Sequence, residues 1–292
     1  MASNENKVPP SGKFPSLLAL VAFSGMSSMG FGGVSLQISG VQNEIVGTTS
    51  EVTGSGSSSN YATNTTVGNF AIFDVAKTDG TDFADLVVRY QADNGGIGSN
   101  IMIAQTSNSQ GLTDSGTISA LIDVGNGGGG TVDLQFDWYA PGSFVGGVEQ
   151  AGSSFITNQI NYTTFDIDFQ QEVSVRNADM AQYTVNGVTE LTGGINSSVT
   201  TFTDSGADST FDDPKTAVGI LSRGGRDQSH LISVGKQNSD GPALFMFEFH
   251  DPSEVVTFTD PQITPIPEVS SSFVMSVLLL LPLSVRHRRR RA

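Results

Sequence analysis

The chain has 292 residues, of which 34 are Gly, none is Cys and 15% are charged, and its acidic residues outnumber Lys and Arg by 29 to 14. Without Cys there are no disulfides, thiolate metal sites or cysteine nucleophiles, and a formal net charge of −15 argues against nucleic acid, whose phosphates require a basic face. The Gly residues follow no three-residue period, which excludes collagen, and the hydrophobic content of 37% is sufficient for a packed core.

The N-terminal segment 1–30 is predicted to be a signal peptide. Lys7 and Lys13 precede the apolar stretch 17–23, and small residues follow it. Positive charge, an apolar stretch and small residues in this order are typical of a secretion signal. The alternative is an irregular N-terminal arm with a first short strand.

Residues 35–262 are dominated by alternation of hydrophobic and polar side chains. In 131–139, four apolar residues from Val132 to Trp138 share one face, and Asp133, Gln135 and Asp137 share the other. The same spacing recurs at 163–169, 172–176 and 243–250. A period of two places alternate side chains on opposite faces of a sheet, so we expect strands with one face in the core and the other in solvent.

Nine further segments have the composition of strands and are separated by turns rich in Gly and Asn. They lie at 67–75, 84–91, 100–105, 117–123, 181–185, 198–203, 217–221, 230–234 and 254–260. Many short strands with frequent turn signals predict an all-β domain, an antiparallel β-sandwich or jelly-roll-like fold. The low-complexity stretch 49–66 is interpreted as a long loop or spacer, and the Pro-rich 261–268 as an extended linker.

The residues give little support to catalysis. His230 and His250 lie within or beside predicted strands without a Gly-x-Ser-x-Gly elbow, and they have no zinc-ligand spacing, so we expect them to pack. Asp166, Asp168 and Glu172 are the best enzymatic candidates, because a retaining glycosidase needs two carboxyl groups about 5 to 5.5 Å apart. We interpret them instead as solvent-facing acids on an amphipathic strand.

The one cofactor that the sequence suggests is calcium. A calcium ion binds about six to eight oxygen atoms, and the carboxylates and carbonyls of loops can supply them. Two stretches are rich in Asp. The first contains Asp74, Asp79, Asp82 and Asp85, and the second contains Asp204, Asp208, Asp212 and Asp213. Neither fits the EF-hand pattern. We favour solvated turn acids and keep a calcium site in the second stretch as the alternative.

An uncharged apolar stretch at 273–285 is followed by a basic tail. At about 1.5 Å per residue a helix of this length spans about 20 Å, less than a hydrocarbon core of about 30 Å. Its polar residues are gathered at its two ends, and Arg286, Arg288, Arg289, Arg290 and Arg291 are typical of a cytoplasmic stop. We predict a short membrane helix at 270–285 with an Arg-rich tail at 286–292. The alternative is a core helix with a basic tail.

Together with the preceding residues, this region resembles the bacterial PEP-CTERM sorting signal. The matching features are Pro267 and Glu268, the apolar stretch and the arginines, while Val269 stands where the family usually has Pro. The resemblance covers 263–292 and implies that an exosortase, a membrane protease-transpeptidase, processes the chain. It also implies anchoring in the inner membrane before processing, then a place at the cell surface or in a matrix with extracellular polysaccharide as candidate partner.

We therefore expect an exported bacterial protein with a non-catalytic β-sandwich ectodomain that is sorted through its C-terminal signal. The alternative is a secreted carbohydrate-active protein, either a glycoside hydrolase or a calcium-dependent carbohydrate-binding module. Residues 35–262 contain 27 acidic and 7 basic residues, a net charge of −20. Such a charge keeps the body soluble and strengthens the argument against nucleic acid.

Overall fold

The computed structural model describes most of the chain between Leu36 and Pro267. The described residues are 36–45, 49–52, 58–61, 66–95, 101–105, 116–124, 129–204, 206, 214–237, 241–250 and 258–267. They belong to one compact unit, Gly32–Ala292, whereas the unit Met1–Phe31 lies outside them. The predicted signal peptide and the predicted membrane helix also lie outside the described residues. No helix within these ranges is long and apolar enough to cross a membrane.

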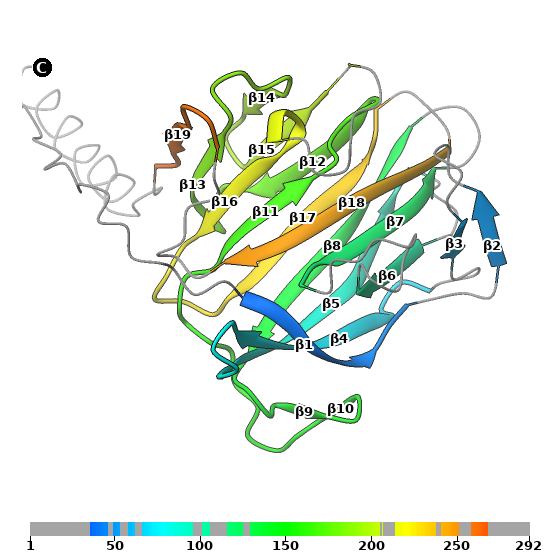
Figure 1. Ribbon diagram of the computed structural model, residues 1–292, viewed down its shortest axis with the longest axis vertical. Coiled ribbons are helices and arrows are strands. Elements are labelled where there is room, and N and C mark those ends of the chain that lie inside the picture. Colours follow the sequence, from blue (N-terminus) through cyan, green and yellow to red (C-terminus); the bar gives the residue numbers. More distant parts are fainter. Residues whose placement is uncertain are drawn as a thin grey trace, which may run out of the picture. The chain divides into compact units, whose positions relative to one another are not determined.

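The larger of two sheets has eight strands in the order β1-β4-β5-β8-β17-β12-β15-β14 (Figure 1). Its members are β1 (Leu36–Asn43), β4 (Phe70–Lys77), β5 (Asp82–Asn94), β8 (Gly130–Tyr139), β17 (Ser229–Lys236), β12 (Gln171–Arg176), β15 (Val199–Thr203) and β14 (Thr192–Ile195). Every pairing in this sheet is antiparallel. Strands far apart in the sequence are neighbours, so the sheet is held by long-range contacts.

The second sheet has seven strands in the order β19-β13-β16-β11-β18-β7-β6. Its members are β19 (Gln262–Pro265), β13 (Met180–Val185), β16 (Val218–Ser222), β11 (Asn161–Phe165), β18 (Gly241–His250), β7 (Ile118–Val124) and β6 (Ile101–Gln105). Two small hairpins add β2 (Thr49–Val52) with β3 (Ser58–Tyr61), and β9 (Phe144–Val145) with β10 (Val148–Glu149). The only helical turn in the described ranges is η2 (Pro214–Thr216).

The predicted antiparallel β-sandwich is confirmed. Alternate side chains of the two sheets meet in one core, as the period of two in the sequence requires. Phe136 of β8 lies 5.0 Å from Phe247 of β18 between ring centroids, and Trp138 meets Phe249 edge-on at 4.9 Å. These rings join the two sheets, and burying such aromatic surface is the dominant favourable contribution to folding.

Two connecting segments differ from the sequence interpretation. Part of 49–66, interpreted as a loop or spacer, forms the hairpin of β2 and β3. The predicted linker 261–268 is wrong over its first part, because Gln262–Pro265 pairs with β13 as an edge strand. Pro lacks an amide hydrogen and is tolerated at sheet edges, at strand starts and at bulges, so a Pro-rich segment is compatible with an edge strand at this position.

The predicted strand 163–169 is also shorter than expected. The strand β11 ends at Phe165, and Asp166, Phe169 and Gln170 adopt positive φ angles of 65°, 44° and 67°. A chain in the left-handed region cannot continue a sheet. The segment therefore crosses from one sheet to the other, since β11 and β12 belong to different sheets.

The inter-sheet ring contacts predict a large loss of stability on Phe249→Ala. Truncation of a buried aromatic leaves a cavity, and we expect the free energy of unfolding to fall by about 3 to 5 kcal/mol in urea denaturation. Val148→Ala, at a site that is 62% exposed on the β9–β10 hairpin, is the control and should change stability by less than about 0.5 kcal/mol. Equal losses in the two variants would contradict the proposed role of this core.

Candidate functional site

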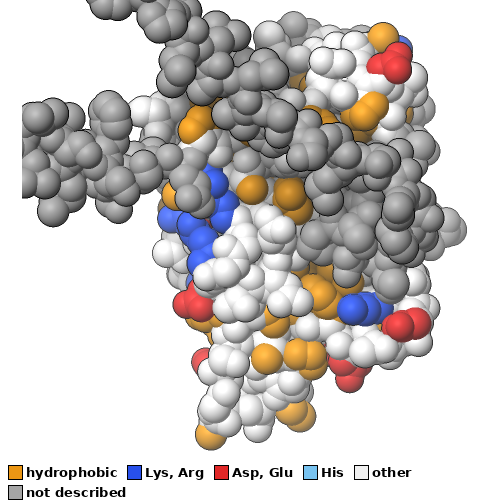
Figure 2. All heavy atoms as spheres, turned by 90° about the vertical axis from the view of Figure 1, so that its left-hand side faces the viewer, with side chains coloured by type: hydrophobic (Ala, Val, Ile, Leu, Met, Phe, Trp, Pro, Cys, Tyr) orange, Lys and Arg blue, Asp and Glu red, His pale blue; other side chains and the backbone are white. Residues whose placement is uncertain are grey.

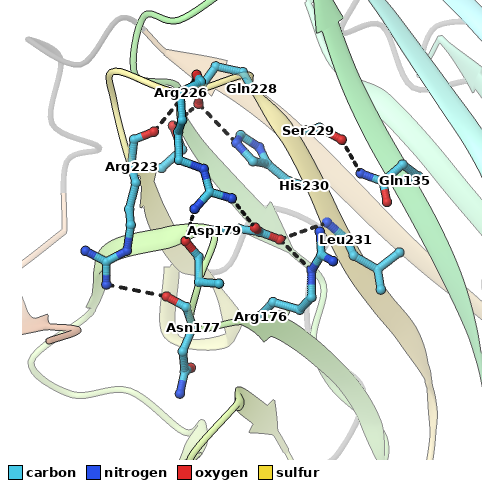
Figure 3. A network of polar contacts seen from close by, with 12 residues as sticks. Gln135, Arg176, Asn177, Asp179, Arg223, Arg226, Gln228, Ser229, His230 and Leu231 are labelled. Atoms are coloured by element: carbon cyan, nitrogen blue, oxygen red, sulfur yellow. Dashed lines mark hydrogen bonds and ion pairs between the residues drawn. The ribbon is translucent and has the colours of Figure 1, made fainter. Parts of the chain in front are cut away.

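A buried carboxylate organises the turn between β12 and β13. Asp179 is 3% exposed. Its Oδ2 accepts hydrogen bonds from Arg176 Nε at 2.7 Å and from the Leu231 amide at 3.3 Å, and its Oδ1 accepts one from Arg226 Nη2 at 2.8 Å (Figure 3). A carboxylate removed from water requires such partners. Asp179 thus binds one residue from each of three segments, namely β12, β17 and the connection before β17.

The arginines around Asp179 form the arginine cluster, which comprises Arg176, Arg223 and Arg226. The side chains of Arg176 and Arg226 are 44% and 42% exposed, so water screens part of their attraction to Asp179. On the face shown in Figure 2, several basic side chains lie side by side, and other basic side chains lie apart from them. In a body with 27 acidic and 7 basic residues, this concentration of positive charge is unusual.

Arg223 connects the cluster to the C-terminal strand. Its amide donates to the Asp179 carbonyl at 3.0 Å. Its Nη2 lies 2.8 Å from the Ile266 carbonyl oxygen, 3.3 Å from that of Pro267 and 3.4 Å from that of Asn177. The first residue of the predicted sorting motif is therefore in contact with the folded body. Glu268, Val269 and the five arginines of the tail lie outside the described residues.

The connection that carries Arg223 and Arg226 is fixed by a buried glutamine. Gln228 Nε2 donates to the carbonyls of both arginines at 2.8 Å. Gln228 Oε1 accepts the hydroxyl of Ser222 at 2.6 Å and lies 3.1 Å from His230 Nε2. The side chain is fully buried, so these bonds replace those it would make with water.

The two histidines of the body pack, as the sequence predicts. His230 is 2% exposed, lies opposite Phe136 in the sheet and stacks on Tyr162 with ring centroids 6.0 Å apart. Burial lowers the pKa of His230 from 6.5 to about 4, since a charged imidazole would lose its hydration. His250 is 6% exposed, and its Nε2 lies 3.4 Å from Glu248 Oε2.

The acids considered for catalysis do not lie on one amphipathic strand. Asp166 and Asp168 are only 3% and 2% exposed, so the prediction that they face solvent on a strand is wrong. Their turn is bent by positive φ angles, which removes the strand alternation. Glu172 of β12 is partly buried, whereas its neighbours Gln171 and Val173 are buried. Because side chains alternate along a strand, the Glu172 side chain lies on the face of β12 opposite to theirs.

The second Asp-rich stretch begins at the same end of the sandwich. The Gln170 amide donates to the Asp204 carbonyl at 3.0 Å, which joins the β11–β12 turn to the chain after β15. Asp204 is 5% exposed. Its Oδ1 accepts the Gly206 amide at 2.9 Å, whereas its buried Oδ2 has no hydrogen-bond partner among the residues that the structure describes. Asp208, Asp212 and Asp213 lie outside the described residues. Among the residues that are described, no three Asp, Glu or His side chains are grouped to hold a metal ion.

The first Asp-rich stretch has structural roles. Asp79 accepts the Thr81 amide at 2.9 Å in the β4–β5 turn, and this bond lowers the pKa of its carboxyl. Asp85 accepts the Phe144 amide at 2.7 Å and the Gly142 amide at 3.3 Å, which anchors the β9–β10 hairpin. Burial raises the pKa of Asp85.

Sequence reasoning missed the Asp179 site. Its members come from two segments about 45 residues apart, and the second of them, 223–230, is a Gly-rich stretch that the sequence marks only as a turn. The pair of arginines within it was the available signal, but pairing with Asp179 depends on the strand order of the folded sheets.

Comparisons with known proteins include a distant likeness to a solved structure. No family model matches the sequence, and no curated protein matches it. Among solved structures, the N-terminal domain of an adhesin from Streptococcus gordonii is similar over 74% of this chain, with a TM-score of 0.44 and 10% identity. This chain covers 60% of that domain. A likeness of this extent says nothing about what the chain binds.

The burial of His230 predicts an acid-dependent loss of stability. In the unfolded chain His230 takes up a proton below pH 6.5, whereas in the folded protein it does so only near pH 4. The contribution of neutral His230 to stability is therefore complete above pH 6.5 and decreases as the pH is lowered toward 4. The pKa difference corresponds to about 3 kcal/mol. We expect urea denaturation of His230→Gln between pH 7 and pH 4 to show a smaller loss than the wild type by about this amount. Parallel pH profiles of the two proteins would contradict the assignment.

Proposed function

We propose that this protein is an exported bacterial protein of the cell surface or extracellular matrix, sorted by a PEP-CTERM-like signal at 263–292. The observation that carries the proposal is the position of Pro267. Its carbonyl accepts a hydrogen bond from Arg223 of the sandwich, and Glu268, the apolar stretch and the arginines follow it in the sequence. The proposed motif therefore begins at a residue that the folded domain holds, and the predicted membrane segment follows in the sequence.

The proposed domain acts through binding and not through catalysis. Asp166 and Asp168 are buried in a bent turn, and Glu172 lies on the next strand, so the single amphipathic strand that would present these acids side by side is not formed. The polar groups of the Asp179 site are bonded to one another and to backbone groups. A net charge of −20 over 35–262 keeps the body soluble outside the cell, and extracellular polysaccharide is its proposed partner.

We also propose that the protein binds a calcium ion at the loop that begins with Asp204. It is supported by the buried Oδ2 of Asp204, which has no hydrogen-bond partner in the described part of the chain. A carboxylate oxygen that is buried without a donor is costly, and a cation would offset that cost.

The sorting proposal is tested in a bacterium that contains an exosortase. We expect Glu268→Ala to abolish conversion of the chain to its mature form, and deletion of 268–292 to release the protein from the cell envelope. Immunoblots of cell fractions measure both effects. Asp227→Asn, an exposed acid in the body, is the control and should be processed like the wild type. Unchanged retention of the deletion variant at the envelope would contradict the signal assignment.

The calcium proposal is tested by calorimetry and melting temperature on the full chain in detergent. A bound ion stabilises the folded state, by about 2.7 kcal/mol at a concentration one hundred times the Kd. We expect heat of binding and a higher Tm with calcium for the wild type and for Asp227→Asn, and neither for Asp204→Asn. Absence of both effects in the wild type would remove calcium from the proposal.

A further inference from the structure

The C-terminal segment 258–267 is part of the sandwich and not a tether. Its strand β19 pairs with β13, with Ile263 opposite Thr184 and Thr264 opposite Tyr183. Backbone hydrogen bonds extend this contact in both directions. The Gly187 amide donates to the Thr259 carbonyl at 2.9 Å, and the Ile266 amide donates to the Ala181 carbonyl at 2.8 Å.

Buried apolar side chains fix this segment at both ends. Phe258 is 7% exposed and lies over Gly219 of β16, where an added Cβ would stand 3.3 Å from its ring. Ile266 is 4% exposed and belongs to the main core of the sandwich. Release of the segment would expose both side chains to water, so the hydrophobic effect opposes it.

One member of the arginine cluster, Arg223, binds the backbone of the residues that follow β19. Arg223 Nη2 donates to the carbonyls of Ile266 and Pro267, at 2.8 and 3.3 Å. Hydrogen bonds from a charged donor are stronger than those between neutral groups. The backbone of Arg223 is itself held, because its amide donates to Asp179 and its carbonyl accepts Gln228 Nε2. Arg223 is thus held in place and binds the backbone of Ile266 and Pro267; we call this set of hydrogen bonds the clamp.

A protease binds several residues on each side of the bond that it cuts in an extended form, so it acts on chain that is locally unfolded. The bonds within 258–267 are held by β13, the core and Arg223. They become accessible only when β19 separates from its neighbour. The folded body therefore excludes its own last strand from the active site of a processing enzyme.

We propose that the sandwich sets the upstream limit of processing, so that the cut falls on the C-terminal side of Pro267 and the mature protein keeps β19, with Arg223 as the positioning residue. This inference rests on the proposed sorting function. In the reaction, the peptide C–N bond breaks and the carbonyl carbon bonds to the oxygen of water or to the nucleophile of an acceptor. The departing amine takes up a proton and leaves with the signal.

The clamp is tested on the full chain in detergent with thermolysin, which cuts before bulky apolar residues and has a site at the Gln262–Ile263 bond. We expect Arg223→Gln to raise the rate of this cut about tenfold, because the strand loses its terminal hydrogen bonds. Arg223→Lys, which keeps a charged donor, should restore part of the protection. Arg89→Gln is the matched control, since Arg89 lies over the Phe70 ring in the other sheet, and it should change the rate less than about twofold.

Hydrogen exchange separates the clamp from general destabilisation. In Arg223→Gln the Ile266 amide should exchange about tenfold faster, while amides of β18 exchange as in the wild type. Equal rates of cutting and exchange in Arg223→Gln and Arg89→Gln would overturn the role of Arg223.

Intact mass of the mature protein from an exosortase-containing bacterium tests the limit itself. A C-terminus at or beyond Pro267 is expected, and one upstream of Pro267 would overturn the inference. An unprocessed chain would instead overturn the sorting function, while the thermolysin result would still report whether the clamp exists. The two failures are therefore distinguishable.

Discussion

The packing of the two sheets against each other is the constraint on which the rest of the molecule depends. Rings from β8 and β18 interlock across the core, so each sheet buries the face that the other leaves open. A sheet with one hydrophobic face is not stable by itself in water. The strand order, the buried polar sites at the rim and the position of the C-terminal strand all follow from the way this core is closed.

Closure of the core leaves polar groups at its rim that must be satisfied inside the protein. Asp85 holds the β9–β10 hairpin, Asp179 holds the β12–β13 turn, and Gln228 and His230 bond to each other beneath the arginines. Each group is buried and bonded because the cost of an unbonded polar group in a core exceeds the cost of ordering its partners. Among the described residues, the buried Oδ2 of Asp204 and the buried Nδ1 of His230 have no hydrogen-bond partner, and a cation is proposed at the carboxylate oxygen.

The proposed function depends on the junction between the sandwich and the C-terminal signal. β19 adds an edge strand to one sheet, and Arg223 holds the residues that follow it up to Pro267. In the proposed function, the held strand gives the sorting enzyme a defined upstream limit. The same arrangement places the arginine cluster beside the first residue of the proposed motif.

The sequence by itself determined the fold class, because the period of two in segments such as 131–139 and 243–250 records which face of each strand is buried. It also supplied the C-terminal motif, since that signal consists of neighbouring residues. Only the tertiary structure decided that 262–265 is a strand and that Asp166 and Asp168 are buried. It alone joined Arg223 to Asp179 and to Pro267. The physical reason is that alternation is a local property of the chain, whereas strand order and the pairing of buried charges depend on which distant segments the closed core brings together.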